Sequence, residues 1–279
     1  MCSDSLKAGK RRHSNREEMF KLYTIPKFLA RRNRSIYPQR VPKTIWQTMK
    51  TSAVPPTMRD WADSWIKLNP EYDYNFLDDE EIRKFIRSSF PDYLRAFEKT
   101  VHGASKADLW RYLVMFRYGG VYADIDCICL KPLREWIDPR AAYVTQLGVN
   151  KDVCQWLIIS VSGNPIFLRA AERALDNILN DITRAEYCGF ELRMGELKLH
   201  EEKPRIKIEH DVLGLTGPPV LQEAAEDCFK SQMCPEIFKY TQVVCTSEET
   251  SCNFKGNVKH DYGNIEYIQG LKQLKTPHY

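Results

Sequence analysis

The fold of this chain is decided by residues 104–129, which read ASKADLWRYLVMFRYGGVYADIDCIC. From residue 105 to residue 118 the apolar side chains recur at helical spacing, so this segment predicts an amphipathic helix that buries Leu109 and Leu113. Gly119 then supplies the left-handed conformation with which many helices end. We therefore expect a helix, a glycine stop and a short strand in direct succession.

Two acidic residues, Asp124 and Asp126, follow the glycines. Side chains two apart in a strand point to the same face, so we expect both carboxylates to meet one hard divalent cation. Such a cation keeps coordination positions open for the phosphate oxygens of a substrate. It would also remove the repulsion between two carboxylates, which are otherwise costly to bury together. The alternative is a pair of solvated acids at the end of a strand.

Asp108 and Arg111 lie three residues apart in the expected helix, and side chains at this spacing are neighbours on one helical face. A further carboxylate and a guanidinium near the acid pair suit a sugar linked to a diphosphate. The planar fork of arginine fits the oxygens of such a ligand. The alternative is a structural ion pair on the helix surface.

The whole block resembles the core of the DXD-containing glycosyltransferases of family 32, which includes yeast-type initiating α-mannosyltransferases. It is similar, more distantly, to the glucosylating domain of large clostridial toxins. Supporting stretches occur in the order of the family: VPKTIWQT at 41–48, YDYNFLDDEEIRKFI at 72–86 and LTGPPV at 215–220. The resemblance runs from residue 41 to residue 220, with a vaguer match at His260.

This resemblance implies an α/β protein with a single GT-A domain, in which helices flank a Rossmann-like open sheet. It implies a metal-dependent hexosyltransferase that uses Mn²⁺ or Mg²⁺ and retains the α configuration. The donor would be a UDP- or GDP-hexose, and the acceptor a hydroxyl of a glycan or glycoconjugate. Strands that alternate with helices along the chain independently predict an open, largely parallel sheet with ligand at its carboxyl ends.

The resemblance also assigns residues to the site. Asp124 would contact the ribose and sugar of the donor, Asp126 would ligate the metal, and both are the candidate catalytic residues and metal ligands. Asp108 and Arg111 match the family's donor-sugar contacts. Tyr122 matches an aromatic residue that lines the donor site, although a core tyrosine is the alternative.

Three further residues are candidates at the same site. Trp46 lies where relatives hold the nucleotide base, and it could stack on the base or fill the core. Gln47 could hydrogen-bond the nucleotide. His260 lies where GT-A enzymes often bring a C-terminal ligand to the metal, and a surface histidine is the alternative.

Composition agrees with a globular enzyme, because 279 residues that are 43% hydrophobic and 28% charged can bury one substantial core. The net charge of +4 is unevenly distributed, since residues 1–40 carry a balance of +8 and the remainder −4. We therefore expect a basic, flexible leader at 1–40 and the catalytic domain at 41–279. A mildly acidic body does not favour a nucleic-acid partner, whose site would be basic.

No segment has the run of about 20 apolar residues that spans a bilayer, and the N-terminus lacks an apolar signal core. We expect a cytoplasmic location, with the leader free or attached to an anionic membrane surface, or a Golgi lumen if an anchor is missing. Nine cysteines show no zinc spacing. Cys127 is expected to be a small core residue, and the thiols to be reduced. A disulfide among the cysteines at 228–252 is left open.

Two other classes of function are left open by the sequence. A catalytically silent protein that binds sugar nucleotides would keep the same residues, and turnover of the donor would distinguish it from an enzyme. An Asp-x-Asp phosphatase is disfavoured, because it expects a hydrophobic strand directly before the acid pair and Thr or Val after it. Here Gly-Gly-Val-Tyr-Ala precedes the pair and Ile128 follows.

Overall fold

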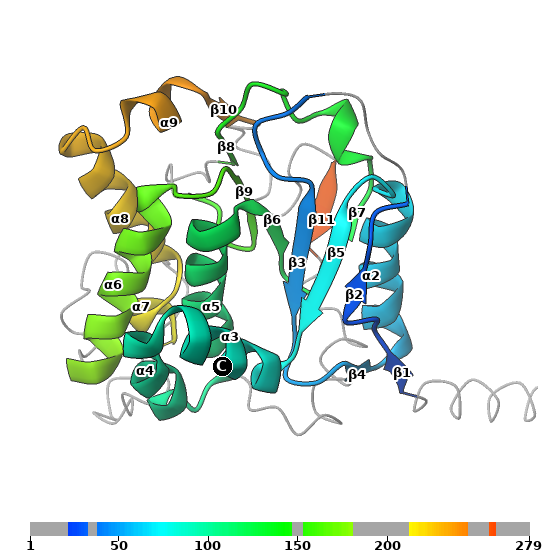
Figure 1. The fold of residues 1–279 in the computed structure, drawn as a ribbon, viewed down its shortest axis with the longest axis horizontal. Helices are drawn as coiled ribbons and strands as arrows, with labels where there is room; N and C mark the ends of the chain where they lie inside the picture. Colours follow the sequence, from blue (N-terminus) through cyan, green and yellow to red (C-terminus); the bar gives the residue numbers. More distant parts are fainter. Residues whose placement is uncertain (1–21, 33–37, 147–152, 181–211, 245–256, 261–279) are drawn as a thin grey trace, which may run out of the picture.

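The computed structural model describes residues 22–32, 38–146, 153–180, 212–244 and 257–260. These residues form a central sheet with helices on both faces (Figure 1). The α/β architecture with an open mixed sheet flanked by helices, which the sequence predicted, is therefore confirmed. None of the helices described is long and apolar enough to cross a membrane.

The main sheet has seven strands in the order β10-β8-β9-β6-β3-β5-β2. Their bounds, in that order, are Thr241–Val243, Tyr143–Thr145, Leu157–Ser160, Gly120–Ala123, Thr44–Thr48, Asp73–Leu77 and Phe28–Leu29. β3 runs parallel to β5 and β6, and β8 runs parallel to β10. β9 runs antiparallel to both β6 and β8, and β2 runs antiparallel to β5. The carboxyl ends of β3, β5 and β6 thus lie at one edge of the sheet.

The expectation of a largely parallel sheet was wrong for β9. A parallel neighbour of β8 needs a crossover of a dozen or more residues, usually through a helix. The connection from β8 to β9 contains no helix among its described residues and is shorter than that. The chain therefore returns in the opposite direction.

The two faces of the sheet are covered by different helices. One face carries α2 (Pro56–Leu68), whose Trp61 and Trp65 belong to the same buried cluster as Ile45 and Val121 of the sheet. The other face carries the larger helical layer (Figure 1). That layer consists of α3 (Asp79–Ser89), η1 (Pro91–Tyr93), α4 (Leu94–Lys99), α5 (Gly103–Tyr118), α6 (Pro165–Asn180), α7 (Val212–Leu215), α8 (Pro218–Lys230) and α9 (Pro235–Lys239). The short element η2 spans Leu133–Glu135.

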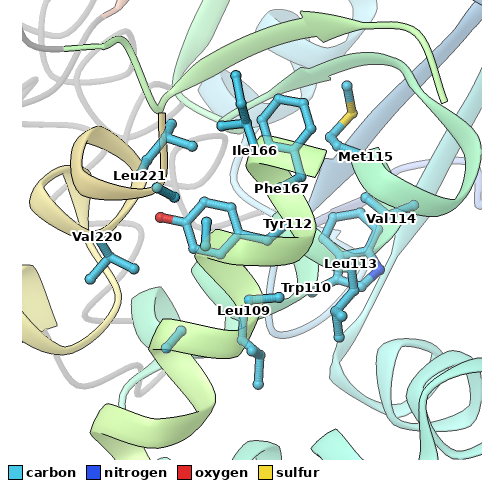
Figure 2. Close-up of a cluster of buried hydrophobic side chains, with 14 of the residues drawn as sticks. Leu109, Trp110, Tyr112, Leu113, Val114, Met115, Ile166, Phe167, Val220 and Leu221 are labelled. Atoms are coloured by element: carbon cyan, nitrogen blue, oxygen red, sulfur yellow. The ribbon is translucent and has the colours of Figure 1, made fainter. Parts of the chain in front are cut away.

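Helix α5 lies at the centre of the helical layer. Figure 2 shows its apolar side chains against those of α6 and α8, with Tyr112 directed toward Val220 and Leu221. Every residue from Asp108 to Met115 is buried, so the helix is covered on more sides than a simple amphipathic pattern predicts. Burying the aromatic and aliphatic side chains on all sides fixes α5, and with it any polar side chain that α5 carries.

The glycine stop after α5 was predicted correctly. Gly119 has φ 62° and Gly120 has φ 102°, both in the region that side chains rarely adopt. A Cβ on Gly120 would lie 2.5 Å from the carbonyl oxygen of Thr44 in β3. These glycines therefore allow α5 to turn directly into β6 beside β3.

Residues 22–32 pack on the rest of the fold, so the prediction of a free basic leader at 1–40 was wrong for them. β1 (Tyr23–Thr24) pairs with β4 (Ala53–Val54), and β2 adds an edge strand to the main sheet. Ile25 is fully buried. Lys27 forms ion pairs with Asp78 and Glu81. At least one basic residue of the segment therefore contacts the folded domain and does not belong to a free arm. Residues 1–21 lie outside the described residues.

The cysteines that the structure describes are free thiols at positions 127, 129, 154, 228 and 234. Cys127 is buried among Val121, Ala123 and Ile125, as predicted. Burial raises the pKa of the Cys127 thiol, which keeps it protonated and unreactive. Cys245 and Cys252 lie outside the described residues.

Candidate active site

The two aspartates lie in a tight turn at the carboxyl end of β6, which we call the acidic turn (Asp124–Cys127). β6 ends at Ala123, and β7 (Cys127–Cys129) begins three residues after Asp124. The Asp124 amide donates to the carbonyl of Trp156 at 2.9 Å, and the Cys127 amide donates back to the Asp124 carbonyl at 3.1 Å. The expectation that both aspartates share one strand face was therefore wrong.

Long-range pairing explains why the strand breaks here. β6 loses its partner β9 after Ala123, and β7 pairs instead with β11 (Val258–His260) near the end of the chain. The turn still brings the two aspartates to the same edge of the sheet. The side chain of Asp124 is 25% exposed, whereas Asp126 is 3% exposed.

Arg111 joins the helix to the acidic turn. One guanidinium nitrogen lies 3.0 Å from a carboxylate oxygen of Asp108 and 3.0 Å from one of Asp124. The other terminal nitrogen donates to the Gln155 carbonyl at 3.1 Å. Burial alone would lower the pKa of Arg111, but Asp124 and the other neighbouring acids raise it well above its usual value. Arg111 is thus a permanent cation between two acids.

Tyr122 completes the contacts of Asp124. Its hydroxyl donates to Asp124 Oδ1 at 2.6 Å, and its ring lies 4.7 Å beneath the guanidinium of Arg111. The ring is buried against Trp110, as the alternative of a core tyrosine expects. The Asp124 carboxylate is therefore oriented by a cation and a phenol together. The contact of Tyr122 with the donor stays a prediction.

Asp108 is held on its other side by Thr216, whose hydroxyl donates to Asp108 Oδ2 at 2.7 Å. Burial raises the pKa of Asp108 to about 7, against the opposing effects of Arg111 and Thr216, and Asp124 adds to the increase. Asp108 and Arg111 are each about 95% buried, so they do not form the surface ion pair that was the alternative.

Sequence reasoning missed the residues that support this pair. Tyr112 donates to the carbonyl of Thr216, and Gln155 donates to the same carbonyl at 3.1 Å. Asn177 in α6 donates to the carbonyl of Leu215. The only local signal was the LTGPPV stretch, which contains Thr216 but does not reveal its partner 108 residues earlier.

Trp46 and Gln47 project from opposite faces of β3. The indole nitrogen of Trp46 donates to the Gly119 carbonyl at 2.9 Å, and the ring stacks on Tyr118. Gln47 is fully buried, and its amide contacts the Asp124 carbonyl and the hydroxyl of Tyr74. Both side chains therefore have protein partners in the structure, and their contact with a nucleotide stays a prediction.

The backbone of His260 lies opposite Cys127, because β11 pairs with β7 in that register. The backbone of residue 260 therefore lies opposite the residue that directly follows Asp126. The side chain of His260 lies outside the described residues, so its assignment as a metal ligand stays a prediction.

The acidic turn fits a hard divalent cation by the chemistry of its donors. Two carboxylates lie two residues apart at the edge of the sheet where parallel strands end, and carboxylate oxygens are the ligands that Mg²⁺ and Mn²⁺ prefer. Among the described residues no group of three or more His, Cys, Asp or Glu side chains could hold a metal. Among these residues, Asp124 and Asp126 would hold the cation.

Comparisons with known proteins agree with the family resemblance that was inferred from the sequence. Residues 55–142 match the family described as glycosyltransferase sugar-binding region containing DXD motif. An initiation-specific alpha-1,6-mannosyltransferase of Candida albicans is 29% identical over 229 residues, which cover 71% of this chain and 56% of that protein. A mannosyl phosphorylinositol ceramide synthase of Saccharomyces cerevisiae is 35% identical over 139 residues, 48% of this chain and 34% of that protein. The predicted resemblance to DXD-containing glycosyltransferases is thereby confirmed.

The chain spans between one third and little more than half of these curated relatives. Among solved structures, the glycosyltransferase PaToxG aligns with a TM-score of 0.46 and 19% identity, covering 72% of this chain and 74% of that one. The ligand-free glycosyltransferase domain of the YGT toxin aligns with a TM-score of 0.45 and 9% identity, covering 74% and 80%.

Proposed function

We propose, from the DXD region in residues 55–142, that this chain is a metal-dependent glycosyltransferase. It moves a hexose from a nucleoside-diphosphate sugar to an acceptor hydroxyl. The observation that supports this most directly is the link made by Arg111, which lies 3.0 Å from both Asp108 and Asp124. The guanidinium of Arg111 thus connects Asp108, which we expect at the sugar, with the acidic turn, which we expect at the diphosphate.

Asp124 and Asp126 would hold the Mn²⁺ or Mg²⁺, which would neutralise the charge of the departing diphosphate. Arg111 holds one carboxylate oxygen of Asp124, so it limits the directions in which that carboxylate can turn. Asp108 is buried beside Arg111 and Thr216, and it would accept hydrogen bonds from hydroxyls of the sugar. Such fixed groups act by orienting the substrate before reaction.

The transferred sugar is proposed to be mannose, because the two relatives reported above are named as an alpha-1,6-mannosyltransferase and a mannosyl phosphorylinositol ceramide synthase. Their names differ in acceptor, so the acceptor is proposed only as a hydroxyl of a glycan or glycolipid. Retention of configuration follows the family resemblance. Arg111 and Tyr122 hold the Asp124 carboxylate in one orientation, which agrees with a reaction that needs no protein nucleophile.

The test is a panel of UDP- and GDP-hexoses, including the mannosyl donors, assayed for Mn²⁺-dependent hydrolysis and transfer. Asp126→Ala should lower turnover at least about 1,000-fold, because the diphosphate loses the cation that stabilises its charge. Asp138→Ala is the matched control, since this acid pairs with Arg140 at the surface. The melting temperature of both variants should stay near that of the parent.

Full activity in EDTA or in Asp126→Ala would contradict metal dependence. Metal-dependent binding of a sugar nucleotide without turnover of any donor or acceptor would instead identify a catalytically silent binding protein.

A further inference from the structure

The backbone carbonyl of Asp124 is held by two donors. The Cys127 amide closes the acidic turn onto this oxygen at 3.1 Å. The side-chain amide nitrogen of Gln47, in the neighbouring strand β3, donates to the same oxygen at 3.1 Å. Gln47 has no exposed surface, so this contact is shielded from competing water.

The direction of the Gln47 amide is fixed by Tyr74. The hydroxyl of Tyr74 lies 2.9 Å from Gln47 Oε1. Burial raises the pKa of Tyr74 well above its usual value, so the hydroxyl keeps its proton and can donate. Because the Asp124 carbonyl can only accept, the amide nitrogen must face Asp124 and the amide oxygen must face Tyr74.

The opposite end of the acidic turn has its own neutral donor. The indole nitrogen of Trp65 in α2 donates to the Cys127 carbonyl at 2.8 Å, and Trp65 is fully buried. The first and last carbonyls of the turn are thus both held by side chains on the α2 face. A turn fixed at both ends has little freedom to change the separation of the carboxylates it carries.

We propose that Gln47 is a positioning residue, which sets the acidic turn so that Asp124 and Asp126 meet the same divalent cation. This inference rests on the proposed function and replaces the expected contact of Gln47 with the nucleotide. A buried amide is costly unless every polar atom is paired. Both ends of the Gln47 amide are paired with protein groups: its nitrogen donates to the Asp124 carbonyl of the turn, and its oxygen accepts from the hydroxyl of Tyr74 in β5.

The two assignments of Gln47 make opposite predictions. If Gln47 contacts the nucleotide, replacing it should lower nucleotide affinity with or without metal. If Gln47 positions the turn, replacing it should lower Mn²⁺ affinity and leave the metal-free affinity for UDP or GDP unchanged. Losing one hydrogen bond to a buried carbonyl corresponds to roughly a 10-fold change in an equilibrium constant.

The experiment compares Gln47→Leu and Tyr74→Phe with the control Thr48→Val. Thr48 is the next residue of β3, and its hydroxyl donates to the Leu77 carbonyl in β5, so the control loses a similar bond away from the turn. Three quantities are measured on the full chain: hydrogen exchange of the Cys127 amide without metal, the Kd for Mn²⁺ in the presence of UDP or GDP, and the Kd for these nucleotides in EDTA.

Gln47→Leu should speed exchange of the Cys127 amide about 10-fold and weaken Mn²⁺ binding about 10-fold. Tyr74→Phe should change both in the same direction by less, because Gln47 keeps its bond to Asp124 but loses the group that orients it. Thr48→Val should change neither. Tyr74→Phe carries the test by itself if Gln47→Leu does not fold.

Unchanged exchange and unchanged Mn²⁺ affinity in the folded variants would overturn the proposal. Weaker nucleotide binding in EDTA would also overturn it, in favour of direct contact. If the parent protein binds neither Mn²⁺ nor any nucleotide, the proposed function fails, and exchange of the Cys127 amide still decides whether Gln47 holds the turn.

Discussion

The two faces of the sheet hold the acidic turn by different chemistry. On the α5 face, the Asp124 side chain is held by a cation and a phenol, Arg111 and Tyr122. On the α2 face, the backbone of the turn is held by an amide and an indole, Gln47 and Trp65. A charged group therefore helps to orient the Asp124 carboxylate, whereas neutral donors fix the peptide that carries it.

This difference has an energetic reason. Buried charges are stable only when they are paired closely, and removing one partner leaves the other uncompensated. Removing a neutral donor from a carbonyl should lower stability less, because only about one hydrogen bond is lost. The α5 face should therefore respond strongly to mutation, pH and metal, and the α2 face should respond weakly and independently of pH.

The largest effect is expected for Arg111→Met. This change leaves Asp108 and Asp124 without the cation between them, which should lower the free energy of unfolding by about 3–5 kcal/mol and turnover by at least about 100-fold. Denaturant unfolding and steady-state kinetics measure the two effects. Arg173→Met in α6 is the control, because its ion pairs with Glu223 and Asp227 are partly exposed and should contribute at most about 1 kcal/mol. Equal losses in the two variants would show that the buried ion pairs of Arg111 contribute no more to stability than exposed ones.

An intermediate effect is expected for the pH dependence that Asp108 confers. Its pKa is raised from 3.8 to about 7 in the folded protein, so folding takes up a proton between these values. The contribution of Asp108 to stability is therefore full below about pH 4, falls as the pH rises and is lost above about pH 7. Burial is the main cause of this raised pKa; Arg111 and Thr216, which face the carboxyl, oppose it, and Asp124 adds to it.

Asp108→Asn should remove this slope. Between pH 4 and 7, in EDTA, the free energy of unfolding of the parent should fall relative to the variant by on the order of 2–4 kcal/mol. Urea titrations at several pH values measure the difference. A parallel pH dependence in both proteins would show that Asp108 is ionised throughout.

The smallest effect is expected for Trp65→Phe on the α2 face. Trp110→Phe is its matched control, because both indoles are fully buried and the Trp110 nitrogen has no hydrogen-bond partner in the described part of the chain. Both changes lose similar ring volume, but only Trp65→Phe leaves the Cys127 carbonyl without its donor. It should cost about 1–2 kcal/mol more than the control, equally at pH 5 and pH 8. A clear pH dependence of this difference would show that the α2 face is coupled to the charged network.

Local sequence patterns predicted most of the secondary structure that carries this site. The glycine stop at Gly119, the helix before it and the adjacency of Asp108 to Arg111 follow from spacing of a few residues. The bond from Thr216 to Asp108 could not be predicted, because its partners are separated by 108 residues and each is an ordinary polar residue in its own segment.

The break in the strand after Ala123 was missed for a related reason. Alternation along residues 121–129 favours one continuous strand, and the competing signal is the pairing of Cys127 with His260 near the far end of the chain. The packing of Ile25 was missed because the basic residues around it dominate the composition. In each case the contact that determines the structure is made with a residue too distant in sequence for a local pattern to reveal it.

The N-terminal strand also protects the sheet from self-association. β2 occupies the outer edge of β5, and the neighbouring Lys27 and Arg31 place charges there through their ion pairs with Asp78 and Asp73. A fragment that begins at residue 41 or 55, where the family resemblance begins, would present the unpaired amide and carbonyl groups of β5 to another molecule. The residue at which the family resemblance begins is therefore not the residue at which the protected sheet begins, because the protected sheet includes β2.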